Sequence, residues 1–201
     1  MRKIKYTKNE LKAQRDNLGR FERFLPTLEL KREQLQLETR RVEAAIEKKK
    51  AEEAAFLADL AGWIRLFAED IDISDYLKVS AIRQDSTNIA GVVIPLFEEV
   101  VFEEVPADLF ETPAWLDDGV AALKKLIGLR AERRILAEQL RLLNAELLVT
   151  SQRVNLFEEV KIPEASENIR VIRIFLGDLD AAGVVRAKIA KRKTIAIMKS
   201  A

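Results

Sequence analysis

The chain has 201 residues, of which 33% are charged and 48% are apolar, and its formal net charge is +1. It has no cysteine and no histidine, which excludes disulfides, metal sites built on thiolate or imidazole, and the usual nucleophile–base pairs of covalent catalysis. Its 7 glycines and 5 prolines are few, and a composition rich in Ala, Glu, Lys, Leu and Arg is typical of long helices or coiled coils.

The sequence shows no sign of export or of a membrane span. Residues 1–5 are mostly basic and lack the apolar stretch of a secretory signal. No segment approaches the length of uncharged apolar sequence that a membrane-spanning helix requires. We therefore expect a cytoplasmic protein.

A first long helix is predicted over residues 8–72. Thr7 and Glu10 have the spacing of a capping box, in which Thr7 accepts a hydrogen bond from a first-turn N–H group. An uninterrupted heptad pattern follows, and most of its seam positions are apolar, which indicates a helix that packs along one stripe. The seam positions are Leu11, Gln14, Leu18, Phe21, Leu25, Leu28, Arg32, Leu35, Thr39, Val42, Ile46, Lys49, Glu53, Phe56, Leu60, Trp63 and Phe67.

Residues 73–118 form a different kind of segment, a small β-rich insert. Residues 79–83 alternate in polarity and residues 89–94 are mainly β-branched, so we predict a β-hairpin with its turn at 84–88 and its end at Pro95. An acidic loop that contains Pro106 and Pro113 is then expected to lead into the second helix.

A second long helix is predicted over residues 119–201. Asp117 and Asp118 lie where acidic side chains favour a helix N-terminus. An apolar seam runs along the helix, and its pattern resumes in a shifted register after Pro163. The seam positions are Leu126, Leu129, Arg133, Leu136, Leu140, Leu143, Leu147, Thr150, Val154 and Phe157, followed by Ile172, Phe175, Leu179, Ala182 and Ile189.

Two helices of similar length, each with one apolar seam, bury these seams best against each other. Because few residues separate the helices, the chain has to double back, with both termini at the same end. The predicted fold is all-α: a long antiparallel two-helix coiled coil with a small β-hairpin insert at the turn. Its expected domains are an N-terminal helix (1–72), the insert (73–118) and a C-terminal helix (119–201).

The register of the helix pair is predicted by setting the two ends of the insert opposite each other. Pro26 and Pro163 then lie level, and because proline removes a helical hydrogen bond, we expect a bend or local unwinding of both helices there. The same register places Arg32 opposite Glu158 and Glu159, which would compensate its charge at a seam position.

Charge is segregated along the chain. Residues 1–50 carry a net charge of +7 and residues 181–201 a net charge of +6, whereas residues 84–123 contain nine acidic residues and no Lys or Arg. Single charges usually lie on solvated faces, but this segregation indicates a basic end where the termini meet and an acidic end around the insert. The basic stretch 186–199 has no interleaved aromatic residues, so nucleic-acid binding is not predicted.

No motif for catalysis or ligand binding is visible. The sequence contains neither of the glycine-rich motifs that bind phosphate groups, G-x-x-x-x-G-K-[ST] and G-x-G-x-x-G. Adjacent acids such as Glu98 and Glu99 are far more typical of solvated loops than of a catalytic pair, which would need burial to raise one pKa. Trp63 and Trp115 are expected in the core rather than in a ligand site. We therefore predict no enzyme activity of its own, no cofactor, no metal and no small-molecule ligand.

Several stretches resemble the D subunit of the V/A-type (vacuolar/archaeal-type) ATPases. Residues 150–163, TSQRVNLFEEVKIP, are similar to that family's T-x-R-R-V-N-x-L-E-x-x-x-I-P pattern, with Gln152 in place of its first Arg. Residues 88–95, NIAGVVIP, resemble its N-x-x-G-V-x-x-P stretch, and residues 31–35 resemble part of its opening helix. The motif residues in this sequence are Arg153, Val154, Asn155, Glu158, Ile162, Pro163, Asn88, Gly91 and Pro95.

The resemblance implies a central rotor shaft that transmits torque between the ring of catalytic A and B subunits and the membrane ion-translocating ring. In that family the paired termini insert into the catalytic ring, the F subunit packs on the side of the shaft, and the lower end sits in the C subunit. The protein would be peripheral to the membrane, within a membrane-bound complex. The two basic ends indicate these contacts to the catalytic ring: Lys3, Lys5, Lys8, Arg186, Lys188, Lys191 and Arg192.

Other coiled-coil proteins remain alternatives. The F-type gamma subunit carries a large α/β domain between its helices, and residues 73–118 are too few to form one. A coiled-coil scaffold or a prefoldin-like chaperone shares the helix–hairpin–helix plan. Co-purification separates these alternatives, because a rotor protein should appear with large ATPase subunits, and a chaperone with its own kind or with unfolded clients.

Overall fold

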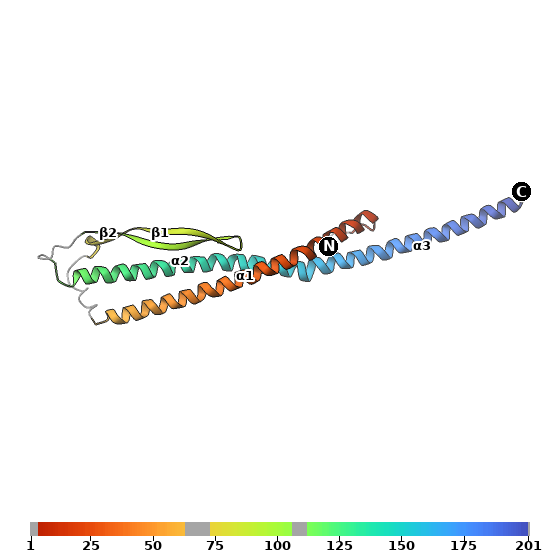
Figure 1. Cartoon of the computed structure of the whole chain (residues 1–201). Helices are drawn as coiled ribbons and strands as arrows, with labels where there is room; N and C mark the ends of the chain where they lie inside the picture. Colours follow the sequence, from red (N-terminus) through yellow and green to blue (C-terminus); the bar gives the residue numbers. More distant parts are fainter. Residues whose placement is uncertain (1–3, 63–72, 106–111, 201) are drawn as a thin grey trace. The chain divides into compact units, whose positions relative to one another are not determined.

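A computed structural model of the chain describes residues 4–62, 73–105 and 112–200. The elements in chain order are α1 (Lys8–Leu60), the short 3-10 helix η2 (Ile73–Asp75), β1 (Leu77–Ile89), β2 (Val92–Glu104), α2 (Leu116–Asn155), the π-helix η3 (Leu156–Lys161) and α3 (Ile162–Ser200) (Figure 1). The predicted fold class is confirmed, with long antiparallel helices and one two-stranded antiparallel sheet. The chain divides into two compact units, residues 1–30 with 150–201, and residues 31–149.

The start and the packing stripe of α1 follow the sequence pattern. The Glu10 N–H group donates a hydrogen bond to Thr7 Oγ1 at 3.2 Å, as the capping box predicts. Every residue of α1 that is buried occupies a predicted seam position, which confirms the seam for this helix. These residues are Leu35, Thr39, Val42, Ile46, Glu53 and Leu60. The predicted seam residues Trp63 and Phe67 lie outside the described residues.

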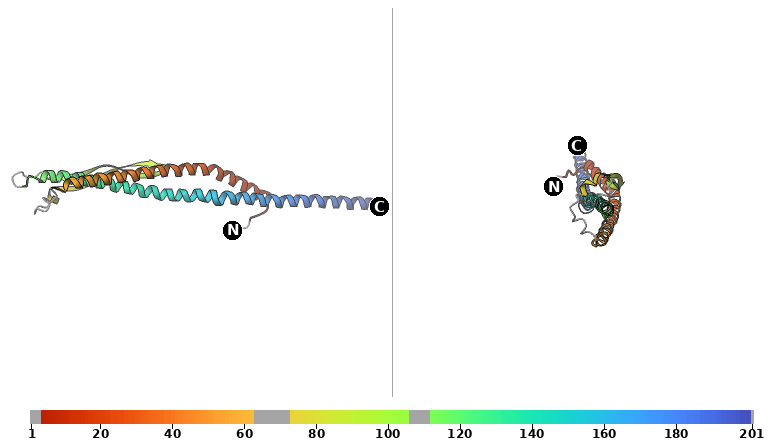
Figure 2. Two further views of the ribbon diagram at one scale, coloured as in Figure 1. Left: turned by 90° about the horizontal axis from the view of Figure 1, so that it is seen from below. Right: turned by 90° about the vertical axis from the view of Figure 1, so that its left-hand side faces the viewer.

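In the unit of residues 31–149, α1 and α2 lie side by side and run antiparallel (Figure 2). The direction follows from two ion pairs that join the helices. Lys31 Nζ lies 2.5 Å from Glu146 Oε1, and Arg130 Nε lies 2.8 Å from Glu53 Oε1. Residues later in α1 therefore face residues earlier in α2.

The core of this unit is built from three elements rather than from two helices. Ile94 of β2 is only 2% exposed and packs in one cluster with Leu35, Val42 and Ile46 of α1 and Leu143 of α2. The hairpin lies along α2 (Figure 1), so this helix needs a second buried stripe beside its seam. The buried residues of α2 outside the predicted seam are Leu116, Gly119, Ala122, Ala131, Ile135 and Gln139.

The hairpin turns at Ala90 and Gly91, so the predicted turn at residues 84–88 is wrong. Ala90 has a φ of 51° and Gly91 a φ of 83°, and Asn88 Oδ1 accepts a hydrogen bond from the Gly91 N–H group at 2.9 Å. Two-residue turns with both central φ angles positive match the twist of the flanking strands. The polar residues 84–88 are exposed and continue β1, and Pro95 lies inside β2 rather than at its end.

The predicted register is wrong in the unit of residues 1–30 and 150–201. Phe21 stacks on Phe157, with ring centroids 5.3 Å apart. Because the helices are antiparallel, Pro163 faces a segment that precedes Phe21, and it does not lie level with Pro26.

The expected pairing of Arg32 with Glu158 and Glu159 is also wrong. Lys31, the neighbour of Arg32, pairs with Glu146 instead. The sequence prediction fixed the register from the ends of the insert, whereas the helices are aligned by their charged side chains and by the hairpin packed on them.

Local unwinding is confirmed at Pro163. The π-helix η3 precedes this proline, and the Ile162 N–H group donates to Phe157 O, five residues earlier. Proline offers no N–H group to the helical ladder, and a wider turn accommodates this loss. At Pro26, by contrast, α1 stays helical, and Thr27 Oγ1 donates to the Phe24 carbonyl at 2.7 Å.

Candidate functional site

The first candidate surface is the part of α3 that follows Phe175. The ring of Tyr6, just before α1, lies beside that of Phe175, with centroids 5.0 Å apart. Since α1 begins at Lys8 and runs antiparallel to α3, it does not accompany the later turns of α3, which continue to Ser200. From Gly177 to Ile195 all side chains except that of Ala182 are exposed.

Apolar side chains on this stretch are distributed around the helix. Val184 is 56% exposed and Met198 is 75% exposed. Successive residues turn by about 100° around a helix axis, so Leu179, Val184 and Val185 point in three separate directions. A helix that packs on one neighbour carries its apolar residues on one face, whereas this pattern suits a helix that is enclosed on several sides. The exposed apolar residues are Leu179, Val184, Val185, Ile189, Ile195 and Met198.

The predicted basic contacts fall into two separate places. Arg186, Lys188, Lys191 and Arg192 are all exposed on this stretch of α3, among its apolar residues. Lys5 and Lys8 are exposed near the start of α1, where Tyr6 contacts Phe175, about three helical turns before Arg186. The structure therefore does not bring the two groups into one cluster, and Lys3 lies outside the described residues.

The second candidate surface is η3 with the residues on either side of it. Val154 is fully buried and Phe157 packs on Phe21, so these two side chains hold the segment in place. None of the six residues of η3 is buried. π-Helical turns are rare and often lie at functional sites. The motif residues Arg153, Asn155, Glu158 and Pro163 are exposed beside the exposed apolar residues Leu156 and Val160, and Ile162 is half-buried.

The motif residues of the hairpin have structural contacts. Asn88 accepts the hydrogen bond from Gly91, whose positive φ favours glycine. A side chain at Gly91 would approach Lys31 Nζ to 3.8 Å, so the turn lies next to the Lys31 ammonium group. The Pro95 carbonyl accepts a hydrogen bond from Gln139 Nε2. These three motif residues shape the turn and fasten the hairpin to the helices.

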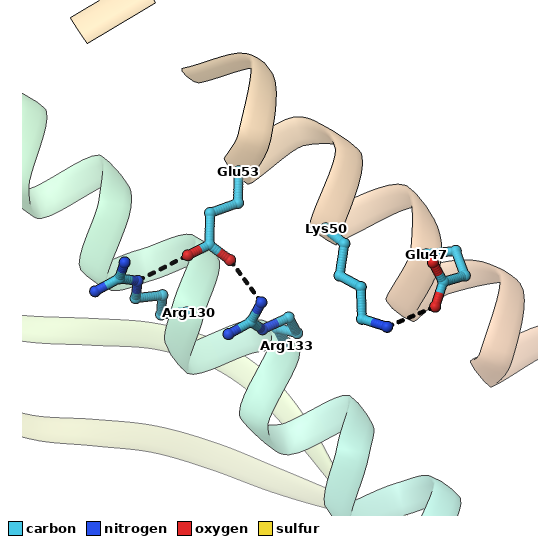
Figure 3. Close-up of polar contacts among 5 residues, drawn as sticks. All are labelled: Glu47, Lys50, Glu53, Arg130 and Arg133. Atoms are coloured by element: carbon cyan, nitrogen blue, oxygen red, sulfur yellow. Dashed lines mark hydrogen bonds and ion pairs between the residues drawn. The ribbon is translucent and has the colours of Figure 1, made fainter. Parts of the chain in front are cut away.

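A charged cluster aligns the helices within the unit of residues 31–149. Figure 3 shows the Glu53 carboxylate between Arg130 and Arg133. Its oxygen atoms lie 2.8 Å from Arg130 Nε and 2.8 Å from Arg133 Nη1. The hydrogen bond from Arg130, together with the positive charges of both arginines, lowers the pKa of Glu53 against the opposing effect of burial. Glu53 and Arg133 were both predicted as charged seam positions, but their pairing with each other was missed because the register was wrong.

A second ion pair across the helices lies close to this cluster. Lys49 Nζ lies 2.9 Å from Glu132 Oε2 and 3.0 Å from Glu52 Oε2. Hydrogen bonds to Glu132 and then to Glu52 raise the pKa of Lys49. Lys49, Glu53 and Arg133, three of the polar seam positions, therefore connect the helices through salt bridges.

The described residues contain no group of three or more acidic side chains that is arranged to hold a metal ion. None of the helices, as far as the structure describes them, contains a stretch both long and apolar enough to cross a bilayer. The surfaces described above suit contacts with other proteins.

Comparison with known proteins gives matches over almost the whole chain. The family of the ATP synthase D subunit matches residues 10–192. The D subunit of a V-type ATP synthase from Borreliella burgdorferi is 45% identical over 195 residues, which cover 97% of this chain and 96% of the relative. Proteins of the same name from Chlamydia trachomatis and Chlamydia caviae are 36% and 34% identical, each over 94% of this chain and over 95% and 93% of the relative.

Proposed function

Since the chain belongs to the family of the ATP synthase D subunit, we propose that it is the central rotor shaft of a V-type rotary ATPase. It is a non-catalytic component that transmits torque between the ring of catalytic A and B subunits and the membrane ion-translocating ring. The F and C subunits are its further partners. It lies on the cytoplasmic side and is peripheral to the membrane, to which it is held through the complex.

The single observation that carries this proposal is the exposed end of α3. Its apolar side chains point in several directions, which suits insertion into a ring of subunits better than packing on one neighbour. Full burial of side chains such as Val184, Val185 and Ile189 would stabilise the assembly by about 1.5 to 3 kcal/mol each. Basic residues between them would select a ring interior that offers carboxylates or carbonyl oxygens.

Torque transmission requires that the two helices do not slide past each other. In the unit of residues 31–149 they are joined by the Glu53 cluster and by the Lys49 and Lys31 ion pairs. If α1 slipped along α2 by one heptad in one direction, Lys49 would face Lys125 instead of Glu132. The two like charges would then repel each other. These contacts support a role in which the helix pair turns as one body.

Neutralising the basic end of α3 should weaken assembly with the catalytic subunits. We expect the variant with Arg186, Lys188, Lys191 and Arg192 all changed to Gln to bind the catalytic ring about tenfold more weakly or worse, since each exposed ion pair contributes about 0.2 to 1 kcal/mol. Affinity is measured by reconstitution with purified catalytic subunits, and the ATPase coupling of the assembled complex is measured in parallel.

The matched control changes four exposed basic residues of the other unit to Gln, namely Arg40, Lys48, Lys50 and Arg134. This control removes the same charge and should assemble normally. Equal assembly of both variants and the parent chain would contradict the insertion of α3. Purification with copies of itself, or with unfolded clients and no ATPase subunit, would instead favour the scaffold or chaperone alternative.

A further inference from the structure

β1 is an open edge of the two-stranded sheet. Among the described residues it pairs with β2 alone. All eleven residues from Lys78 to Asn88 are exposed. In an antiparallel pair, the N–H and C=O groups of alternate residues point away from the partner strand. Backbone donors and acceptors of β1 therefore face solvent in three runs, separated by register shifts between Val79 and Ala81 and between Arg83 and Gln84.

The two edges of the sheet differ in how well they are protected from pairing with a further strand. β2 packs on the helices through the buried side chain of Ile94, and the Pro95 carbonyl accepts a hydrogen bond from Gln139. Pro95 also removes one N–H donor from β2. β1 contains no proline, and within the described part of the chain no helix or strand covers its outer side.

Charges on β1 do little to block its edge. Natural proteins often protect an edge strand with charged side chains that face an approaching strand. Arg83, however, is paired with Glu99 of β2 at 2.6 Å, and Asp85 Oδ1 accepts a hydrogen bond from the Ser86 N–H group. Lys78 lies near the beginning of the strand. The two register shifts interrupt the edge, so the longest unbroken run open to another strand is residues 84–88.

Apolar side chains on β1 indicate that the edge is covered in the assembled protein. Val79 is 47% exposed and Ile82 is 42% exposed. A neighbouring strand would cover these side chains with its own and would extend the sheet to three strands.

A second copy of the chain is a poor occupant of this edge. Full-length antiparallel pairing of two copies of Leu77–Ile89 is centred on Arg83, which would lie directly opposite Arg83 of the other copy. Like charges opposite each other destabilise a strand pair. A strand from a different protein has no such restriction.

We propose that β1 accepts an extended strand from another protein of the ATPase complex, so that the hairpin becomes part of a sheet shared between two proteins. Recognition comes from backbone hydrogen bonds along β1 and from apolar side chains that cover Val79 and Ile82. This inference rests on the proposed function, since the partner belongs to the same complex.

Hydrogen exchange resolved to single residues tests the proposal on the intact complex and on the isolated chain. The amides between Lys78 and Asn88 that point away from β2, other than that of Ser86, which already donates to Asp85 Oδ1, should exchange at least about tenfold more slowly in the complex, because each gains a backbone acceptor. Unchanged exchange in a complex that does contain the chain would overturn the strand addition and leave the proposed function intact. Failure of the chain to enter the complex would instead overturn the proposed function.

Two variants test whether the slower hydrogen exchange results from a strand that pairs with the edge of β1. Val79→Lys combined with Ile82→Lys places two charges on β1 and should weaken binding of the neighbouring protein by about tenfold or more. The control is Val93→Lys on β2, at a position that is 62% exposed, and it should bind as the parent does. Circular dichroism confirms that both variants stay folded.

Two further results would overturn the assignment. The first is equal weakening by the β1 double variant and by the β2 control, because the edge would then have no special role. The second is protection of 78–88 in the isolated chain that grows with protein concentration, because the edge would then belong to a second copy.

Discussion

Leu143→Ala should lower the free energy of unfolding by about 2 to 5 kcal/mol. Leu143 is fully buried where α1, α2 and the hairpin meet, and it packs in one cluster with Leu35, Val42, Ile46 and Ile94. Removal of its side chain leaves a cavity that three elements would have to close together. Urea unfolding followed by circular dichroism measures the loss.

Two control variants make this prediction specific to burial. Leu148→Ala on the same helix removes the same atoms from a side chain that is 61% exposed, and it should change stability little. Thr39→Val should raise stability by about 1 kcal/mol, because Thr39 Oγ1 is buried with no hydrogen-bond partner among the described residues. Equal effects of Leu143→Ala and Leu148→Ala would contradict the three-element core.

Glu53→Gln should give the second large effect, a clear loss of stability at neutral pH. The neutral amide loses the ionic part of both contacts and leaves Arg130 and Arg133 without their carboxylate partner. Glu47→Gln is the control in the same helix (Figure 3), because Glu47 is exposed and contacts only Lys50 among the residues drawn there. This control should have little effect.

Lowering the pH should remove the stabilisation that the Glu53 cluster gives to the parent chain. The pKa of Glu53 is lower in the folded chain than the value of about 4.3 for an unperturbed glutamate, so its stabilisation is present above that value. It is lost as the pH falls below about 4 and through the folded pKa. The parent chain should therefore lose more stability between pH 6 and pH 3 than Glu53→Gln, and parallel curves would contradict the role of the Glu53 carboxylate.

Helix periodicity was predicted better than helix register. The heptad pattern identified every buried residue of α1, because burial along one stripe leaves a direct mark on the sequence. Register depends on which charged side chains meet, and Glu53 could have been matched to several arginines. The ion pairs of Lys31, Lys49 and Glu53 emerge only when both helices and the hairpin are placed together.

The hairpin shows why polarity alone misplaces a turn. Residues 84–88 are polar because they lie on an exposed strand, and Ala90 carries no turn signature despite its positive φ. Gly91 and Asn88 were recognised as part of a family motif, but their hydrogen bond locates the turn. The second buried stripe of α2 was missed for a related reason, since small residues such as Ala131 pack against a sheet without forming a strong apolar pattern.

The candidate surfaces were only partly visible in the sequence. The basic residues of α3 were predicted from charge, whereas the predicted seam residue Ile189 and its neighbour Val185 are exposed in the chain alone. Whether α1 covers these side chains of α3 depends on where α1 begins relative to Phe175. That position follows from the register of the two helices. The π-helix likewise reflects a local fit around Pro163 that no periodic pattern encodes.

Rotation of the chain inside the working complex tests the proposed shaft most directly. The chain has no cysteine, so Val93→Cys on the exposed face of β2 provides a unique site for a gold particle. With the complex fixed to a surface through its catalytic subunits, addition of ATP should make the particle turn in one direction. A particle that stays still while the same complexes hydrolyse ATP would contradict the role of this chain as the rotor.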